Sequence, residues 1–340
     1  MTIKTTLQQW FGDKADPRNQ KIVQIAKTVI IVALLLSLFS IIPIPSVWEV
    51  IQASNPYLLI IGIFLGLPSI YARSILLGLI TQKQGLALSF NRLFRVNMVI
   101  KFYLLFLPGG LVGSGLRWAK VSQYGKSAET LGAIAYNRVI EFFVVIISGI
   151  FLYLVGVDQE IMDFNILILF VLGLFVGFFI FLYSTRILTR LFEKSTKKSF
   201  KHGFVQKVWE YFDRVLNSMK IYSELTIKES LLIFGASFFG YILILASYIL
   251  IARSIGIDIS IFDLGWTHAV VFFAAFTPLS IAGGLGIRDV SLVFMLSLFG
   301  VDPEVALAFS LLIFSRGVFL SLIGGMVALY EVMDKKRIEN

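Results

Sequence analysis

The chain has 340 residues, of which 57% are hydrophobic and 15% are charged, and its net charge is +9. Soluble domains contain about 25% charged residues, so this composition excludes an ordinary soluble protein. The positive charge does not indicate nucleic-acid binding, because most Lys and Arg residues lie between apolar runs, where they report topology. The absence of cysteine excludes disulfides, thiolate nucleophiles and Cys-bound metals.

Apolar runs that are long enough to cross a hydrocarbon core of about 30 Å recur along the sequence. We predict an all-α, multi-pass integral membrane protein with one transmembrane domain over 1–340. About six full spans are expected, at residues 22–42, 57–80, 131–154, 164–183, 230–252 and 305–330. The first run ends at Pro43 without a small-residue cleavage site, so we expect a retained helix and not a signal peptide.

Two further apolar stretches, 96–122 and 266–299, are interrupted by proline and glycine. Non-helical backbone at membrane depth is tolerated only inside protein or beside a wet cavity. Both stretches are therefore expected to form hairpins that face an interior. The first interruption contains Pro108, Gly109 and Gly110, and the second contains Pro278, Gly283, Gly284 and Gly286.

The distribution of basic residues predicts the topology. The segment 186–228 contains ten Lys and Arg residues, whereas 43–55, 157–163, 254–265 and 300–304 contain none. Placing every basic segment in the cytoplasm puts both termini there and makes each broken stretch cross the membrane an even number of times. The first leg, 96–107, would be only about 18 Å of helix, so the first hairpin is expected to be re-entrant. The second is either re-entrant or a pair of tilted spans.

The two hairpins would enter from opposite sides of the membrane, which predicts an inverted repeat over about 96–157 and 266–333. In each repeat, 24 residues separate the glycine that follows the hairpin from a glycine in the next span. The pairs are Gly125 with Gly149 and Gly300 with Gly324. Broken helices in inverted repeats form the substrate site of many secondary transporters.

The segment 186–228 is expected to be a basic cytoplasmic loop that contains a helix. Val205, Val208, Phe212 and Val215 recur at helical spacing, with charged residues on the other face. This pattern predicts an amphipathic helix on the anionic leaflet surface. The alternative is a soluble helix that packs on the protein.

Charged residues inside apolar spans mark candidate sites, because their burial in a membrane is costly. Arg138 and Glu141 are three apart on one helix and are therefore neighbours. They form either an ion pair that packs two spans or part of an anion site. Arg316 has no acid within one turn, so it needs Glu141, Asp289 or an anionic ligand.

The second hairpin places Arg288 and Asp289 directly after its glycines, and the first places Arg117 after its own. Glycine allows close backbone approach to a ligand, and a helix start offers free amide donors to a phosphate. The alternative is that these glycines only allow tight helix packing. Arg73 and Lys101 are further candidate charges. We favour the alternative that their aliphatic stems carry both charges to the cytoplasmic face.

Motifs for catalysis and cofactors are lacking. His202 and His268 are in no metal-ligand spacing, and His268 is expected to be a hydrogen-bonded residue near the membrane surface. Tyr124-Gly125-Lys126-Ser127 resembles the end of a phosphate loop, but Lys120 occupies the position of the required upstream glycine. We therefore expect no catalytic residues, no metal, no cofactor and no enzymatic activity.

The hairpin motifs resemble those of a bacterial membrane family, the transmembrane region of lysylphosphatidylglycerol synthase and its stand-alone, flippase-like relatives. The similarity runs from about residue 20 to 333. The first half is carried by 108–117 and by Asn137-Arg138-Val-Ile-Glu141. The second half is carried by 278–289 and by Asp302-Pro-Glu304-Val-Ala306.

This resemblance implies movement of lipids or lipid-linked intermediates across the bacterial cytoplasmic membrane. The family commonly has an acid where this chain has Asn137, and glutamate where it has Asp289. The first difference removes a carboxylate beside Arg138, which Glu141 could replace. The soluble aminoacyl-transfer domain of the full synthases is absent from the sequence, so lysyl transfer is not expected.

The sequence therefore predicts a lipid flippase that binds an anionic headgroup between its two hairpins. Its partners would be anionic or polyprenyl-phosphate-linked membrane lipids, and not nucleic acid. The predicted substrate-binding residues are Pro108, Gly109, Gly110, Arg117, Arg138, Glu141, Pro278, Gly283, Gly284, Gly286, Arg288, Asp289 and Arg316.

Three alternatives remain open at this point. The first is a transporter of a small soluble anion or ion, which would use the same hairpins. The second is a non-transporting membrane partner of a lipid synthase or glycosyltransferase, in which all intramembrane charges would pair with one another and leave no cavity. The third is an intramembrane enzyme, for which no catalytic set is recognisable.

Overall fold

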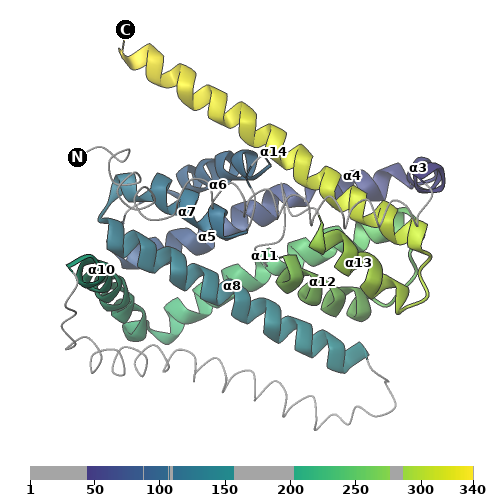
Figure 1. Ribbon diagram of the computed structural model, residues 1–340, viewed down its shortest axis with the longest axis horizontal. Helices are drawn as coiled ribbons and strands as arrows, with labels where there is room; N and C mark the ends of the chain where they lie inside the picture. The colour runs from purple at the N-terminus through teal and green to yellow at the C-terminus, as the bar shows by residue number, and fades with distance from the viewer. Residues whose placement is uncertain are drawn as a thin grey trace.

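The fold is helical throughout the residues described in the computed structural model, which contain no strand (Figure 1). These residues are 44–86, 88–105, 107, 110–156, 203–275 and 286–339. The helices are α3 (Ile44–Gln52), α4 (Pro56–Phe64), α5 (Gly66–Lys83), α6 (Phe90–Leu104), α7 (Gly110–Val121), η1 (Ser122–Tyr124), α8 (Ser127–Gly156), α10 (Gly203–Met219), η2 (Lys220–Glu224), α11 (Ile227–Ser254), α12 (Ile261–Ala275), α13 (Ile287–Ser297) and α14 (Pro303–Glu339).

Four helical segments in the described part are long and apolar enough to cross a membrane, which confirms four of the six predicted spans in length and composition. They are Pro56–Lys83, Ser127–Gly156, Ile227–Ser254 and Pro303–Glu331. The predicted spans 22–42 and 164–183 lie outside the described residues. One span differs from the expected single helix, because α4 ends at Phe64 and α5 begins at Gly66.

The ends of the spans follow local capping chemistry. The side chain of Asn55 accepts hydrogen bonds from the first amides of α4, and Pro56 occupies the position where no N–H is needed. Thr226 and Glu229 form a reciprocal capping box at the start of α11. Gly256 and Gly300 have positive φ after α11 and α13, and this conformation ends both helices where glycine has no steric penalty.

Each broken stretch forms two helices that pack against each other, α6 with α7 and α12 with α13. The connections at 106, 108–109 and 276–285 lie outside the described residues. The first hairpin begins earlier than expected, because Ser89 caps α6 at its start. Its first leg is 15 residues long, or about 22 Å at the rise of an α-helix, which is still shorter than a hydrocarbon core.

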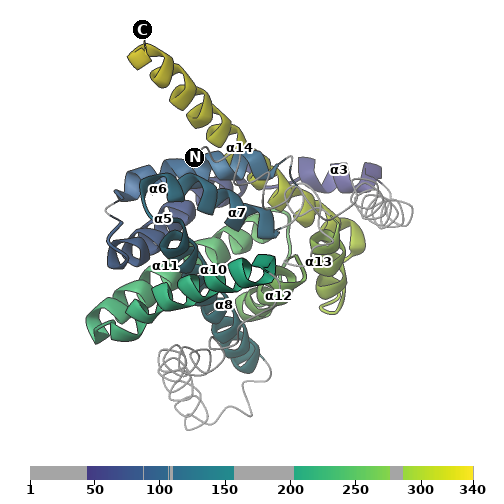
Figure 2. The same cartoon turned by 60° about the vertical axis from the view of Figure 1, so that its left-hand side comes forward.

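The packing between the two halves of the chain is reciprocal. α6 packs along α14, and α12 packs along α8, while α5 and α11 pack directly against each other (Figures 1 and 2). Within each half, the hairpin also contacts the long helix that follows it, α7 with α8 and α13 with α14. Exchanging the two halves therefore leaves the pattern of neighbours unchanged.

The two glycines that the sequence pairs across the halves lie at equivalent contacts. A Cβ atom on Gly149 of α8 would lie 2.5 Å from the Cβ atom of Ala269 in α12. On Gly324 of α14 it would lie 2.0 Å from the carbonyl oxygen of Met98 in α6. Both glycines thus allow a long helix to lie against the first helix of the opposite hairpin.

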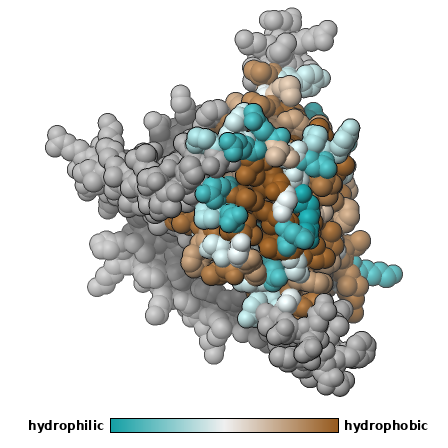
Figure 3. All heavy atoms as spheres, turned by 90° about the vertical axis from the view of Figure 1, so that its right-hand side faces the viewer, coloured by the Kyte–Doolittle hydropathy of each residue, from teal (hydrophilic) through white to brown (hydrophobic). Residues whose placement is uncertain are grey.

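The basic segments meet at one end of the helix bundle. Lys83 of α5 forms an ion pair with Glu229 of α11 at 2.8 Å, and Lys120 of α7 pairs with Glu331 of α14 at 3.3 Å. Segments without Lys or Arg meet at the opposite end, where the amide of Asn55 donates to the carbonyl of Ser254. Figure 3 looks onto this opposite end, where polar and apolar side chains are interspersed. The grouping agrees with the predicted sidedness of the loops.

The predicted amphipathic helix is α10, which lies at the basic end and packs against α8. Val215 of α10 is buried, and the Ser218 side chain reaches the position where a Cβ atom on Gly132 of α8 would lie. Part of its apolar face is therefore covered by protein, as the packed alternative requires. Its location on a leaflet surface stays a prediction.

Replacing Gly324 with alanine should lower the free energy of unfolding by about 1 to 3 kcal/mol, because the added methyl group collides with backbone and must separate α6 from α14. Unfolding of the purified protein in sodium dodecyl sulfate measures the change. Gly317→Ala is the matched control on the same helix, since nothing lies within 4 Å of its Cβ position. Equal destabilisation by both substitutions would contradict close helix contact at Gly324.

Single-cysteine labelling tests the sidedness, and the natural chain is already free of cysteine. Lys126→Cys and Asn217→Cys at the basic end should react with an impermeant maleimide only after the cells are permeabilised. Gln52→Cys and Asp258→Cys at the opposite end should react in intact cells, because both positions are exposed there. Labelling of all four positions from the same side would contradict the predicted topology.

Candidate functional site

The first hairpin positions Arg117 through hydrogen bonds to uncharged side chains. Arg117 of α7 donates from Nε to the Oδ1 atom of Asn97 in α6 at 3.0 Å. The Nδ2 atom of Asn97 donates in turn to the Oγ atom of Ser74 in α5 at 2.8 Å. Asn97 is buried, so this chain of contacts ties three helices together at the predicted site residue Arg117.

Arg138 and Glu141 form an ion pair inside the bundle. The Nη1 atom of Arg138 lies 2.8 Å from Oε2 of Glu141, and Asn137 donates to the other carboxylate oxygen at 3.1 Å. Arg138 also donates to the Oγ atom of Ser114 in α7 at 3.2 Å. Glu141 therefore supplies the carboxylate that Asn137 lacks, as the sequence suggested, and the pair holds α7 against α8.

Arg288 and Asp289 form a second ion pair at the start of α13, with 2.6 Å between Nη2 and Oδ1. Asp289 is buried, and it also accepts hydrogen bonds from the amide of Gly286 and from the hydroxyl of Ser310 in α14. Gly286 has a φ of 103°, a conformation that favours glycine. The Asp289 carboxylate thus stabilises the turn before α13 and connects the start of α13 to α14.

Arg316 differs from these arginines, because neither Glu141 nor Asp289 is its partner. Its Nη1 atom donates to the Oγ atom of Ser247 in α11 at 2.6 Å, and its guanidinium lies 5.4 Å from the ring centroid of Tyr248. Of the three alternatives, pairing with Glu141 or with Asp289 is therefore wrong, and an anionic ligand stays a prediction. Each acid already forms an ion pair with an arginine of its own helix, one or three residues away in sequence.

Arg73 and Lys101 lie deeper than the sequence suggested. Arg73 is ten residues from the basic end of α5 and Lys101 is eleven from the start of α6, or about 15 Å along each helix. The Lys101 ammonium is within electrostatic range of Arg73, Arg288 and Arg316. The expectation that Arg73 and Lys101 extend to the surface is not supported, because both charges are within electrostatic range of Arg316.

The remaining predicted site residues cannot be placed with these charges. Gly110 is the first residue of α7. Pro108, Gly109, Pro278, Gly283 and Gly284 lie outside the described residues. Backbone approach to a ligand at these glycines, and a chamber between the two hairpin turns, therefore stay predictions.

Comparison with known proteins identifies the family of this chain. The model of the family described as lysylphosphatidylglycerol synthase TM region matches residues 24–325. The chain belongs to this family. No curated protein and no solved structure matches it significantly. The match covers most of the chain, so the resemblance stated from the sequence is confirmed, and it is consistent with a membrane protein that is tied to lipid handling.

In this member of the lysylphosphatidylglycerol synthase TM region family, three cations that lie within electrostatic range of one another lack a carboxylate partner. Arg73, Lys101 and Arg316 form no ion pair within the described part of the chain. Arg316 is in electrostatic range of Arg73 and Arg288, and Lys101 of all three arginines. An unpaired positive cluster in an apolar interior can hold an anion.

His268 was not predicted as a site residue, but it lies beside this cluster. It is 6% exposed and its ring centroid lies 4.7 Å from that of Tyr248, the residue over which Arg316 is placed. Its Nδ1 atom has no hydrogen-bond partner among the described residues. The expected hydrogen bond is therefore not found at Nδ1 among the described residues, and the expected position near the membrane surface stays a prediction.

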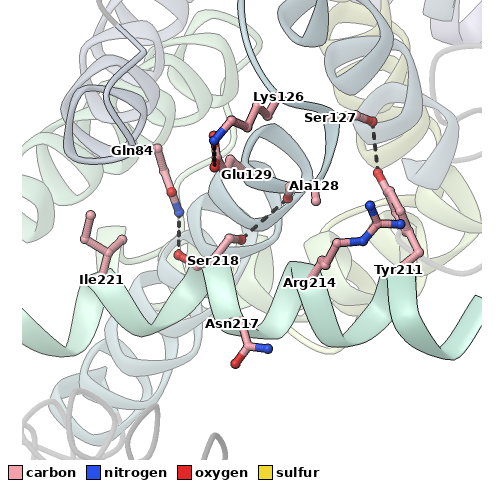
Figure 4. A pocket seen from close by; sticks show the side chains of 10 residues that line it. All are labelled: Gln84, Lys126, Ser127, Ala128, Glu129, Tyr211, Arg214, Asn217, Ser218 and Ile221. Atoms are coloured by element: carbon pink, nitrogen blue, oxygen red, sulfur yellow. Dashed lines mark hydrogen bonds and ion pairs between the residues drawn. The ribbon is translucent and has the colours of Figure 1, made fainter.

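A separate pocket of about 770 Å³ lies at the basic end, where the start of α8 faces α10 and η2 (Figure 4). Ser127 and Tyr211 are joined across it by a hydrogen bond of 3.0 Å, and Gln84 donates to the carbonyl of Ser218 at 2.7 Å. Lys126 pairs with Glu129 at 3.3 Å. Its charges are thus partly neutralised, and it lies apart from the cluster of Arg73, Lys101 and Arg316. No group of three or more metal-ligating side chains occurs among the residues that the structure describes.

Removing the carboxylate of Asp289 should destabilise the fold strongly. Asp289→Ala leaves Arg288 largely buried without its counter-charge, which should lower the free energy of unfolding by about 3 to 5 kcal/mol. Asp258→Ala is the control, because Asp258 pairs with Arg253 while remaining 89% exposed, and such surface pairs contribute little. Unfolding of both variants in detergent measures the difference, and similar values for the two would refute a structural role for the buried pair.

Proposed function

We propose that this protein moves a lipid or lipid-linked intermediate between the leaflets of the bacterial cytoplasmic membrane, with both termini in the cytoplasm. The observation that carries the proposal is the group of three cations, Arg73, Lys101 and Arg316, that lack a carboxylate within the described residues. An anionic headgroup would supply the missing negative charge. The acyl or polyprenyl chains would stay in the bilayer while the headgroup crosses.

The depth of these cations supports a site inside the membrane and not at its surface. Arg316 lies 15 residues before Glu331 on α14, or about 22 Å from the basic end. A charge at such a depth is stabilised by a counter-charge or by water. A phosphate that reached this point would be near the middle of its path.

The two ion-paired arginines have a different role in the proposal than the sequence suggested. Arg138 and Arg288 are each neutralised by an adjacent carboxylate, so we assign them to holding the hairpins against α8 and α14. We assign binding of the phosphate to Arg316, together with Arg73 and Lys101. Family membership supports the lipid class, since the matched family is a region of a lipid-modifying synthase.

Reciprocal packing supports the inverted repeat on which alternating access would depend. α6 lies along α14 as α12 lies along α8, with Gly324 and Gly149 at the close contacts. Related hairpins that enter from opposite sides would each lead to the same central charges. Rocking of one half against the other could then expose those charges to either side in turn.

The same three cations argue against a non-transporting partner of a synthase or glycosyltransferase, since that role predicts intramembrane charges that are all mutually paired. A transporter of a small soluble anion is the second candidate, because the cluster would also attract inorganic phosphate. We assign no enzymatic activity and no cofactor. Transport of lipid and transport of phosphate are separated by experiment.

Reconstitution tests the proposed site at Arg316. Arg316→Gln keeps a hydrogen-bonding side chain but removes the charge, and it should slow transbilayer movement of a fluorescent anionic phospholipid by at least about tenfold, since hydrogen bonds to charged groups are the stronger ones. Dithionite quenching of the outer leaflet measures the rate in proteoliposomes.

Arg253→Gln is the matched control, because that arginine pairs with Asp258 at the end without basic loops. Its proteoliposomes should retain the wild-type rate. Equal rates for wild type and Arg316→Gln would remove the proposed site. Uptake of radiolabelled inorganic phosphate in place of lipid would favour the soluble-anion transporter.

A further inference from the structure

Two polar side chains are buried in the same part of the bundle as Arg316 without hydrogen-bond partners for one of their polar atoms among the described residues. Tyr241 of α11 is 4% exposed and His268 of α12 is 6% exposed. The Tyr241 hydroxyl and the His268 Nδ1 atom form no hydrogen bond within the described residues, and neither does the buried Nε atom of Arg316. Three unsatisfied polar groups therefore occur in one region of the interior.

Ring contacts link these groups in a chain that runs from Tyr241 through His268 and Tyr248 to Arg316. The His268 ring centroid lies 5.5 Å from that of Tyr241 and 4.7 Å from that of Tyr248. The guanidinium of Arg316 lies 5.4 Å from the Tyr248 ring and is within electrostatic range of His268. The unsatisfied groups thus come from α11, α12 and α14, which are brought together only by the fold.

Buried polar groups in native proteins are nearly always hydrogen-bonded, so a group of exceptions that lies beside an unpaired charge indicates a site for water or a polar ligand. The chemistry of the three groups indicates what such a ligand carries. Arg316 only donates, which suits a phosphate oxygen. The Tyr241 hydroxyl both donates and accepts, and a histidine nitrogen can accept as well as donate.

We propose that Tyr241 and His268 recognise the hydroxyl groups of a headgroup whose phosphate ester is bound at Arg316. A phosphate ester that is deprotonated only accepts hydrogen bonds, whereas a hydroxyl both donates and accepts, so a polyol or sugar phosphate satisfies all three groups together. This inference rests on the proposed function for its lipid source. A free phosphate ester with hydroxyl groups has the same chemistry.

The first test compares two soluble probes with the same carbon skeleton and charge. Glycerol 3-phosphate has two hydroxyl groups that propyl phosphate lacks. Isothermal titration of the detergent-solubilised full chain should give about tenfold tighter binding of glycerol 3-phosphate, the contribution expected of one or two net hydrogen bonds. Tyr241→Phe and His268→Ala should each reduce this preference to about twofold or less.

Thr267→Val is the matched control for removal of a buried hydroxyl. The Thr267 hydroxyl is also fully buried without a partner, but adjacent helical residues do not face the same side. This variant should keep the wild-type preference. Loss of the preference in Thr267→Val as well would overturn the proposal, because the effect would then be structural.

The second test uses lipids and separates this inference from the proposed function. Proteoliposomes containing phosphatidylglycerol or phosphatidylpropanol, which differ by the same two hydroxyl groups, are compared for leaflet exchange. Wild type should favour phosphatidylglycerol, and Tyr241→Phe should not. Exchange of both lipids at equal rates, together with no preference between the soluble probes, would contradict the proposed hydroxyl site. The proposed flippase activity would still be supported. A preference for glycerol 3-phosphate without any lipid exchange would support the hydroxyl site and contradict the proposed flippase activity.

Discussion

A guanidinium or ammonium group inside an apolar bundle keeps its charge only where carboxylates, hydrogen-bond acceptors or a ligand replace the water it has lost. This protein meets that demand in two different ways. Arg138 and Arg288 have carboxylates at sequence separations of three and one. Arg316 has a serine hydroxyl and an aromatic ring instead. The first arrangement is complete in itself, whereas the second leaves positive charge that a ligand can use.

The charges converge only because the helices approach closely. Gly149 and Gly324 let α8 and α14 lie against the opposite hairpins without a side chain between them. In a membrane this packing has little hydrophobic driving force. Small residues at the interface let the helix backbones approach closely enough for van der Waals contact. Without this close packing, Lys101 on α6 and Arg316 on α14 would lie farther apart and would not form one electrostatic group.

The sequence was sufficient to predict features that depend on neighbouring residues. Apolar length predicted the four described spans, and a spacing of three predicted the contact of Arg138 with Glu141. The distribution of Lys and Arg predicted which loops lie together. Proline and glycine located both breaks, although the start of α6 was placed six residues too late because Ser89 was not recognised as its cap.

Features that depend on contacts between distant segments were not predictable from pattern. Arg316 was predicted to need Glu141, Asp289 or an anionic ligand, and the sequence could not show that each acid lies closer to an arginine in its own helix. His268 was expected to be hydrogen-bonded, yet its Nδ1 atom has no partner among the described residues and its ring packs between tyrosines of α11. The aliphatic stem of Arg73 was expected to carry its guanidinium to the cytoplasmic surface, where water would solvate the charge. Helix packing places it instead in electrostatic range of Arg316.

Under the proposed inverted repeat, the excess positive charge has a simple origin. Glu141 and Arg316 each lie eight residues before the glycine that packs on the opposite hairpin, Gly149 in α8 and Gly324 in α14. Equivalent positions therefore have opposite charges. In the first half the acid neutralises Arg138, and in the second half the arginine adds to Arg73 and Lys101. A symmetric frame with this one inversion can position hairpins from both sides while directing an anion to the second half alone.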